Sequence, residues 1–223
     1  MPVEKVVPTG VIGADGVLRE VDTIVCATGF DTTYRPRFPI IGKNGTNLQD
    51  KWVEESTAYF GVTEVDMPNF VLHGGPPGPL QNGSPLGVHH ALSSYGIKMI
   101  TKLQNENIRS LRPKASALRD FHDYIQALVP HTVFNDECRS WYRNNKTGKV
   151  TNIYPGSALH FMEMLERPRW EDYEIEYWNE NRFAFMGWGY VKGFKEPGGD
   201  LTYYLTPDKI DPEWIKALRS TAT

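Results

Sequence analysis

The sequence predicts an α/β fold, on the basis of one apolar strand and several amphipathic helices. Residues 21–27 are rich in β-branched side chains and end in a nearly continuous apolar run, which is typical of a strand buried on both faces of a sheet. Further along the chain, apolar residues recur at intervals of three and four, which is the period of a helix face. Together these patterns indicate a sheet covered by helices.

Composition is that of an ordinary globular protein. The chain has 223 residues, of which 40% are hydrophobic and 23% charged, enough for one large or two small domains. The net charge of −3 and the lack of a basic stripe argue against nucleic acid as a partner. No apolar run reaches the roughly 18 residues of a membrane span. No signal peptide is visible at Met1, so we expect a cytoplasmic protein.

The first third of the chain contains turn and strand signals. Asp15-Gly16 stands between short apolar stretches, and this dipeptide is typical of a hairpin turn. The strand at residues 21–27 follows it. Residues 70–73 are a second, short strand candidate, which leads into a loop rich in Gly and Pro at 74–85.

Three helices are predicted after that loop. Ser84 and Pro85 suit the cap and first turn of the first helix. The second begins near Pro113 and ends at Pro130, and the third spans residues 157–166. The apolar faces consist of Val88, Leu92, Tyr95, Met99 and Leu103 in the first helix, and of Leu118, Phe121, Ile125 and Leu128 in the second.

Residues 22–31 resemble a segment of flavin-containing and Baeyer–Villiger monooxygenases, in which a strand ends in Ala-Thr-Gly followed by an aromatic residue. Residues 38–61 and the His-Gly-Gly-Pro loop at 73–76 follow the same family. The resemblance implies that Thr28 and Gly29 lie where the chain returns from the nicotinamide domain to the flavin domain. Small residues there let the backbone approach another group closely.

The resemblance also assigns a role to the start of the first helix. Asn82 and Ser84 open this helix, which in the family points its N-terminus at the flavin. A helix N-terminus carries a partial positive charge and free N–H groups, which suit the negative edge of a reduced flavin. The alternative is that the Gly/Pro loop is only a rigid connector.

Residues 138–157 resemble the C-terminal signature of Baeyer–Villiger enzymes, with Ser-Trp, then Gly-Lys, then Tyr-Pro-Gly. The resemblance implies that Trp141 helps to enclose the nicotinamide cofactor and that Lys149 lies near it. An indole offers an N–H donor and a large apolar face. The alternative is that Trp141 is a core anchor.

Residues 167–187 resemble the fungal branch of the family, which works on polycyclic or polyketide-type ketones and aldehydes. The resemblance therefore implies a flavoprotein monooxygenase with FAD and NADPH as cofactors, O2 as co-substrate and a small-molecule carbonyl compound as substrate, in fungal secondary metabolism. Residues 201–205 are a further strand candidate and 211–219 a short final helix.

The resemblance covers only the later part of a family member, because neither Gly-x-Gly-x-x-Gly dinucleotide loop is found in the sequence. The implied fold is an incomplete FAD/NAD(P)-binding flavoprotein fold. Residues 1–107 would be the C-terminal part of that domain, and 108–223 a helical and irregular extension. No residue is assigned as catalytic. We expect an N-terminal dinucleotide-binding portion as partner, and low stability of the chain alone.

Two alternatives stay open. The chain could be a non-catalytic truncated remnant or a partner-dependent fragment, so whether it is an enzyme by itself is undecided. A relative that hydroxylates nitrogen or oxidises sulfur would share the Ala-Thr-Gly-Phe segment. No metal site is expected, because the six histidines show no ligand spacing and Cys26 and Cys138 are far apart in the sequence.

Overall fold

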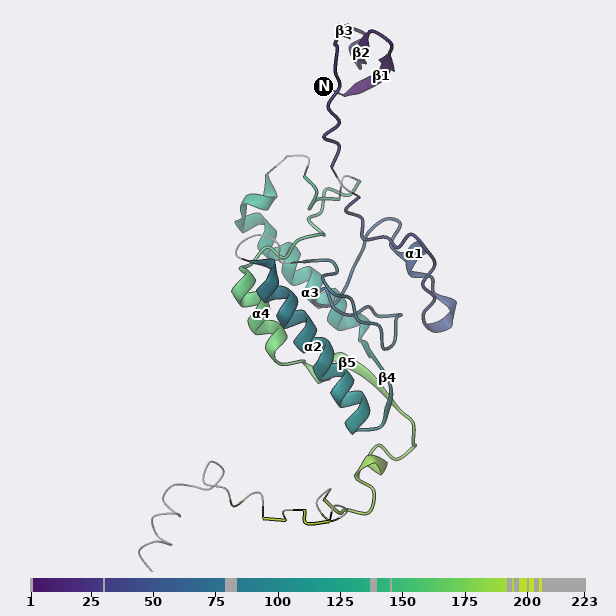
Figure 1. The fold of residues 1–223 in the computed structure, drawn as a ribbon, viewed down its shortest axis with the longest axis vertical. Coiled ribbons are helices and arrows are strands. Elements are labelled where there is room, and N and C mark those ends of the chain that lie inside the picture. Colours follow the sequence, from purple (N-terminus) through teal and green to yellow (C-terminus); the bar gives the residue numbers. More distant parts are fainter. Residues whose placement is uncertain are drawn as a thin grey trace, which may run out of the picture. The chain divides into compact units, whose positions relative to one another are not determined.

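The computed structural model describes residues 2–29, 31–78, 84–136, 140–144, 146–191, 194, 197–199, 201–202 and 205. The chain divides into two compact units, unit 1 (Met1–Thr33) and unit 2 (Tyr34–Thr223), and each is described by itself (Figure 1). Both helices and strands are present, which confirms the predicted α/β class. The strand predicted at 201–205 lies partly, and the helix at 211–219 entirely, outside the described residues.

Unit 1 contains a three-stranded antiparallel sheet of β1 (Val3–Val7), β2 (Gly10–Gly13) and β3 (Leu18–Glu20), in the order β1-β2-β3. The predicted turn joins β2 to β3. Gly16 has a positive φ of 72°, and the Asp15 carboxylate accepts a hydrogen bond from the Val17 N–H at 3.1 Å. The Asp-Gly signal therefore predicted this hairpin correctly.

The strand predicted at residues 21–27 is not formed. Residues 22–29 have no regular secondary structure, and Ile24 and Val25 are 47% and 85% exposed. A strand buried on both faces needs neighbouring strands and covering helices. None of the described strands pairs with this segment, so its apolar side chains face water.

The first predicted helix is α2 (Pro85–Asn105). The Ser84 hydroxyl caps it by accepting a hydrogen bond from the Leu86 N–H at 3.3 Å. Four of the five residues of the predicted face are buried, and Leu103 is half-buried. This face packs against α4 (Ala158–Glu166) and β4 (Ile108–Pro113).

The other predicted helices are also present. α3 (Ala115–Leu128) starts after Pro113 and ends before Pro130, and α4 is capped by the Ser157 hydroxyl, which accepts from the His160 N–H at 3.1 Å. The sequence reasoning did not predict the short α1 (Leu48–Lys51). Single 3₁₀ turns lie at Lys43–Gly45, Val129–His131, Val133–Asn135, Trp170–Asp172 and Ala184–Met186.

A two-stranded antiparallel sheet of β4 (Ile108–Pro113) and β5 (Tyr173–Tyr177) was not predicted. β5 alternates Tyr-Glu-Ile-Glu-Tyr, with Tyr173 buried and both glutamates exposed. This period of two is a strand signal.

The strand predicted at residues 70–73 is wrong, because these residues form no strand. The Leu72 N–H instead donates to the Val62 carbonyl at 2.7 Å, within an irregular loop. α2 and β4 contact each other, on either side of the boundary expected between 107 and 108, and that boundary stays a prediction. Among the described helices, none is long and apolar enough to cross a bilayer.

Candidate functional site

The Gly/Pro loop at residues 73–78 is fixed against the core of unit 2. The Gly75 N–H donates to the Gly61 carbonyl at 2.9 Å, and Leu72 is bound to Val62 as described above. Gly61 has a positive φ of 64°, and a Cβ there would lie 2.8 Å from the Gly75 oxygen. Only glycine fits at this crossing. The loop is therefore held in one position on its way to α2.

Asn152 connects this loop to Trp141. Its carbonyl accepts a hydrogen bond from the Gly78 N–H at 3.3 Å, and its side-chain amide donates to the Trp141 carbonyl at 3.1 Å. Gly78 and Ile153 form an isolated parallel bridge. Asn152 is only 6% exposed. The structure thus brings Trp141 beside the Gly/Pro loop, through a residue that the sequence reasoning missed.

The Trp141 ring itself is open to solvent. It is 45% exposed, and it meets the Tyr142 ring edge to face, with centroids 5.8 Å apart. The alternative of a buried core anchor is therefore wrong. A half-exposed indole whose backbone is held by a buried amide suits contact with a ligand.

Lys149 ends a tight turn. The Asn144 N–H donates to the Lys149 carbonyl, and the Gly148 N–H to the Asn144 carbonyl, both at 2.8 Å. The Lys149 ammonium lies 3.6 Å from a Glu55 carboxylate oxygen, and its side chain is 55% exposed. Such an exposed pair contributes little stability, so the charge of Lys149 is available to a ligand.

His122 on α3 lies close enough to Lys149 and Glu55 to be affected by their charges. Burial lowers the pKa of His122, and the nearby Lys149 charge acts in the same direction, while Glu55 and a backbone hydrogen bond with Ala58 oppose it. The ring is therefore neutral at physiological pH. Its Nε2 atom is buried and has no hydrogen-bond partner in the part of the chain that the structure describes.

Two histidines and a serine clamp the loop to the second turn of α2. The His73 and His89 rings are stacked, with their Nδ1 atoms 3.2 Å apart. The Ser93 hydroxyl donates to the His89 carbonyl at 2.9 Å, so His73 Nε2 is the donor in its 2.8 Å contact with the same hydroxyl. With the His73 proton on Nε2, His73 Nδ1 is the acceptor and His89 Nδ1 the donor in the contact between the two rings.

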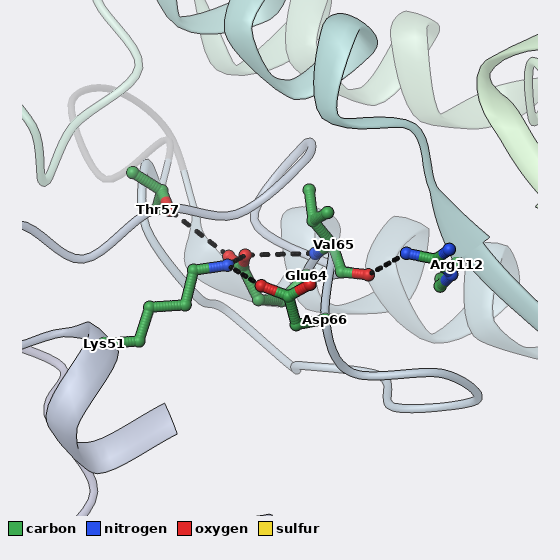
Figure 2. A network of polar contacts seen from close by, with 6 residues as sticks. All are labelled: Lys51, Thr57, Glu64, Val65, Asp66 and Arg112. Atoms are coloured by element: carbon green, nitrogen blue, oxygen red, sulfur yellow. Dashed lines mark hydrogen bonds and ion pairs between the residues drawn. The ribbon is translucent and has the colours of Figure 1, made fainter. Parts of the chain in front are cut away.

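A buried charge network joins Lys51 of α1 to residues 57–66 (Figure 2). The Lys51 ammonium donates to Glu64 at 2.5 Å and to Asp66 at 2.8 Å, and the Thr57 hydroxyl donates to Glu64 at 3.3 Å. Glu64 is fully buried. Burial raises the pKa of Glu64, because it outweighs the attraction of Lys51. This network holds the segment that contains Gly61.

A second buried network consists of tyrosines. The Tyr95 and Tyr173 hydroxyls are 2.8 Å apart, Thr63 lies 3.1 Å from Tyr173, and Tyr59 donates to Asp172 at 2.5 Å. Burial raises the pKa of Tyr173 to about 12. These hydroxyls therefore keep their protons near neutral pH. No three His, Cys, Asp or Glu side chains of the described residues come close enough to hold a metal ion.

No protein-family model matches the sequence. The chain is 48% identical over 220 residues to the FAD-binding monooxygenase moxY of Dothistroma septosporum, and 47% identical over 211 residues to the FAD-binding monooxygenase stcW of Emericella nidulans. The chain is homologous to fungal FAD-binding monooxygenases. These matches cover 97% and 94% of the chain but 35% of each relative, so it spans about a third of their length.

Solved structures of flavin monooxygenases share the fold. Cyclohexanone monooxygenase from Rhodococcus sp. Phi1 bound to NADP+ matches with a TM-score of 0.64 and 27% identity, over 79% of this chain and 34% of that one. A closed crystal structure of cyclohexanone monooxygenase gives 0.65 and 26%, with the same coverage. These neighbours are Baeyer–Villiger monooxygenases, which confirms the resemblance stated from the motifs.

The six residues predicted to line a flavin monooxygenase site fall into three groups. Thr28 and Gly29 lie in the exposed segment of unit 1, where Gly29 has a positive φ of 78°. Asn82 lies outside the described residues. Ser84, Trp141 and Lys149 lie in unit 2, and Asn152 ties Trp141 to the loop that leads toward Ser84. Their roles toward cofactors stay predictions.

Proposed function

We propose that this chain contributes the flavin-facing helix and the nicotinamide-side loop of a Baeyer–Villiger-type flavoprotein monooxygenase in fungal secondary metabolism. The observation that carries the proposal is 48% identity to an FAD-binding monooxygenase over 97% of the chain. When bound, FAD and NADPH supply the redox chemistry that uses O2 to oxygenate a ketone or aldehyde. The carbonyl compound becomes an ester or lactone.

The start of α2 fits the negative edge of a reduced flavin. Residues 84–87 are exposed, and Leu86 is 76% exposed. The N–H groups of a first helical turn have no acceptor within the helix, apart from the one that Ser84 caps. The helix dipole adds partial positive charge at the same place. In the proposal, Ser84 holds the first turn of α2 in place, and the N–H groups of that turn face the flavin.

Trp141 and Lys149 serve the nicotinamide dinucleotide in this proposal. The exposed indole covers the nicotinamide side and excludes water, and Asn152 keeps the backbone of Trp141 in place. Lys149 attracts the dinucleotide phosphates, because its contact with Glu55 at 3.6 Å leaves its ammonium accessible.

We further propose that an N-terminal dinucleotide-binding portion completes the site. The chain spans 35% of the relatives' length, and its sequence contains neither glycine-rich dinucleotide loop. In the complete protein, residues 21–27 would enter a sheet. Thr28 and Gly29 would then mark the return to the flavin domain.

The second candidate is a non-catalytic remnant or partner-dependent fragment, which the missing glycine loops favour. Flavin absorbance separates the two. The chain is joined to the part of the D. septosporum relative outside the match, purified, and assayed for flavin and for ketone-stimulated NADPH oxidation. The enzyme predicts a yellow protein and an ester or lactone product. A colourless protein supports the remnant. A yellow protein whose NADPH oxidation is stimulated by an amine or a thioether, and not by the ketone, supports a relative that hydroxylates nitrogen or oxidises sulfur.

A matched pair of tryptophan variants tests the nicotinamide-side assignment in the joined protein. Trp141→Ala should raise the KM for NADPH about tenfold, as expected for loss of a large aromatic contact. Trp188→Ala removes a ring that is 92% exposed and should leave KM unchanged. Equal KM values for both variants would rule out the role assigned to Trp141.

A further inference from the structure

Unit 2 carries a preformed groove beside the β4–β5 sheet. Its volume is about 750 Å³, and it is lined by residues 40–43, residues 67–70 and both strands. Asn69 fixes the floor, because its backbone N–H and its side-chain oxygen bind Leu111 of β4, both at 2.9 Å. Its side-chain amide also donates to the Arg109 carbonyl at 3.0 Å. A volume of roughly 300–1,000 Å³ is usual for small-molecule sites.

The groove does not belong to the candidate flavin site. α2 has 21 residues, and β4 begins shortly after its last residue. A helix of that length is about 30 Å long. The groove therefore lies toward the opposite end of α2 from Ser84, as the positions of α2 and β4 in Figure 1 show.

The charges that line the groove leave an excess cation. The Lys43 ammonium lies 2.7 Å from a Glu176 carboxylate oxygen, and this contact holds the pKa of Glu176 below its usual range. Lys43 and Glu176 thus neutralise each other. Arg109 is the second cation. Its charge also acts on Glu176, but no described carboxylate lies within ion-pair distance of it, so the lining carries one more positive than negative charge and attracts an anion.

Apolar surface lies next to that cation. The Trp178 ring is 65% exposed, and the Arg109 guanidinium lies 5.5 Å from its centroid. Ile41, in the lining segment 40–43, is 62% exposed. Phe70, in the lining segment 67–70, is half-buried. Exposed apolar side chains gathered in a concave site are typical of a ligand-binding surface.

We propose that this groove binds a flat aromatic carboxylate with one or two fused rings. The rings cover the apolar surface of Trp178 and Ile41, and the carboxylate pairs with Arg109. A guanidinium matches a carboxylate with two parallel hydrogen bonds, and it can do so while its plane stays near an aromatic ring. The proposal concerns a second small-molecule site and does not rest on the proposed monooxygenase activity.

Calorimetric titration of the 223-residue chain with naphthoate and with its uncharged isostere naphthamide tests the proposal. Naphthoate should bind with a Kd below about 1 mM, and naphthamide at least about tenfold more weakly, because it lacks the charge-assisted pair. Arg109→Gln should reduce naphthoate affinity about tenfold. Arg119→Gln, an exposed arginine on α3, is the matched control and should not change it.

Trp178→Ala should also weaken naphthoate binding, since it removes the stacking surface. Circular dichroism spectra that match those of the unchanged chain show that each variant is folded. The proposal is overturned if naphthoate does not bind, if naphthamide binds equally well, or if Arg109→Gln and Arg119→Gln have the same affinity.

Discussion

Two apolar segments of this chain have opposite fates. In α2 of unit 2, Val88 and Tyr95 are at most 4% exposed, because α4 and the β4–β5 sheet cover them. In unit 1, Val25 is 85% exposed, although residues 24–27 are all apolar. The difference shows that an apolar pattern indicates a need for burial, whereas burial itself depends on which partners are at hand.

The largest effect should separate these two segments directly. Leu92→Ala in α2 should lower the free energy of unfolding of unit 2 by about 2–5 kcal/mol, because Leu92 is 2% exposed and leaves a cavity. Val25→Ala should change stability by less than about 0.5 kcal/mol. Urea denaturation followed by circular dichroism measures both. Similar losses would mean that residues 22–29 are buried in solution.

The buried charge network should give the next effect. Lys51→Met leaves Glu64 buried without its cation and should lower the free energy of unfolding by about 1–3 kcal/mol, less than for a fully buried pair because Lys51 is 28% exposed.

Because burial raises the pKa of Glu64, the folded state holds the proton more tightly than the unfolded state. The contribution of Glu64 to stability is then complete below the usual Glu range and is lost as pH rises through its folded-state pKa.

Glu64→Gln removes that titration, so the urea midpoint of this variant should depend less on pH across the same range. Lys51→Arg keeps a cation and serves as the matched control. A Glu64→Gln variant with an unchanged pH profile would contradict the account of this network.

Asp172 should behave in the opposite way. Burial works against its ionisation, but hydrogen bonds from Tyr59 and Arg169 prevail and hold the pKa of Asp172 below its usual value of 3.8. Its contribution is therefore complete above that value and is lost as pH falls through the folded-state pKa. Asp172→Asn should cost about 1–2 kcal/mol near neutral pH and flatten the acid side of the stability profile. Tyr59→Phe should reproduce part of this change.

The smallest effect concerns Asn152. Asn152→Ala removes the hydrogen bond to the Trp141 carbonyl and should cost about 0.5–1.5 kcal/mol. Asn181→Ala, at an exposed position, should stay within about 0.5 kcal/mol. Tryptophan fluorescence should change in the first variant only. If it changes in neither, Asn152 does not hold Trp141.

Local signals predicted the helices well. Ser84 caps its helix as expected, the third helix lies within one residue of its predicted start, and the apolar period of three and four placed the buried face of α2. The β4–β5 sheet was missed, even though residues 173–177 alternate between apolar and acidic side chains. The acidic residues of that stretch obscured the pattern, and the partner strand lies far away in the sequence.

The candidate site was predictable only in part. A short local motif singled out Trp141 and Lys149, and their roles toward cofactors stay predictions. Asn152, His122 and the His73–His89 pair depend on contacts between segments that are distant in sequence, such as the pairing of Gly78 with Ile153. Residues 21–27 were predicted as a strand from pattern alone, and pattern does not supply the neighbouring strands that such a segment needs.

The flavin midpoint potential of the joined protein tests the central claim most directly. Leu86→Glu places a negative charge on the exposed first turn of α2, and Leu159→Glu places one on the equally open α4. If α2 faces the flavin, Leu86→Glu should lower the midpoint potential, because it disfavours the negatively charged reduced form, and Leu159→Glu should not. Identical potentials in both variants would contradict the account.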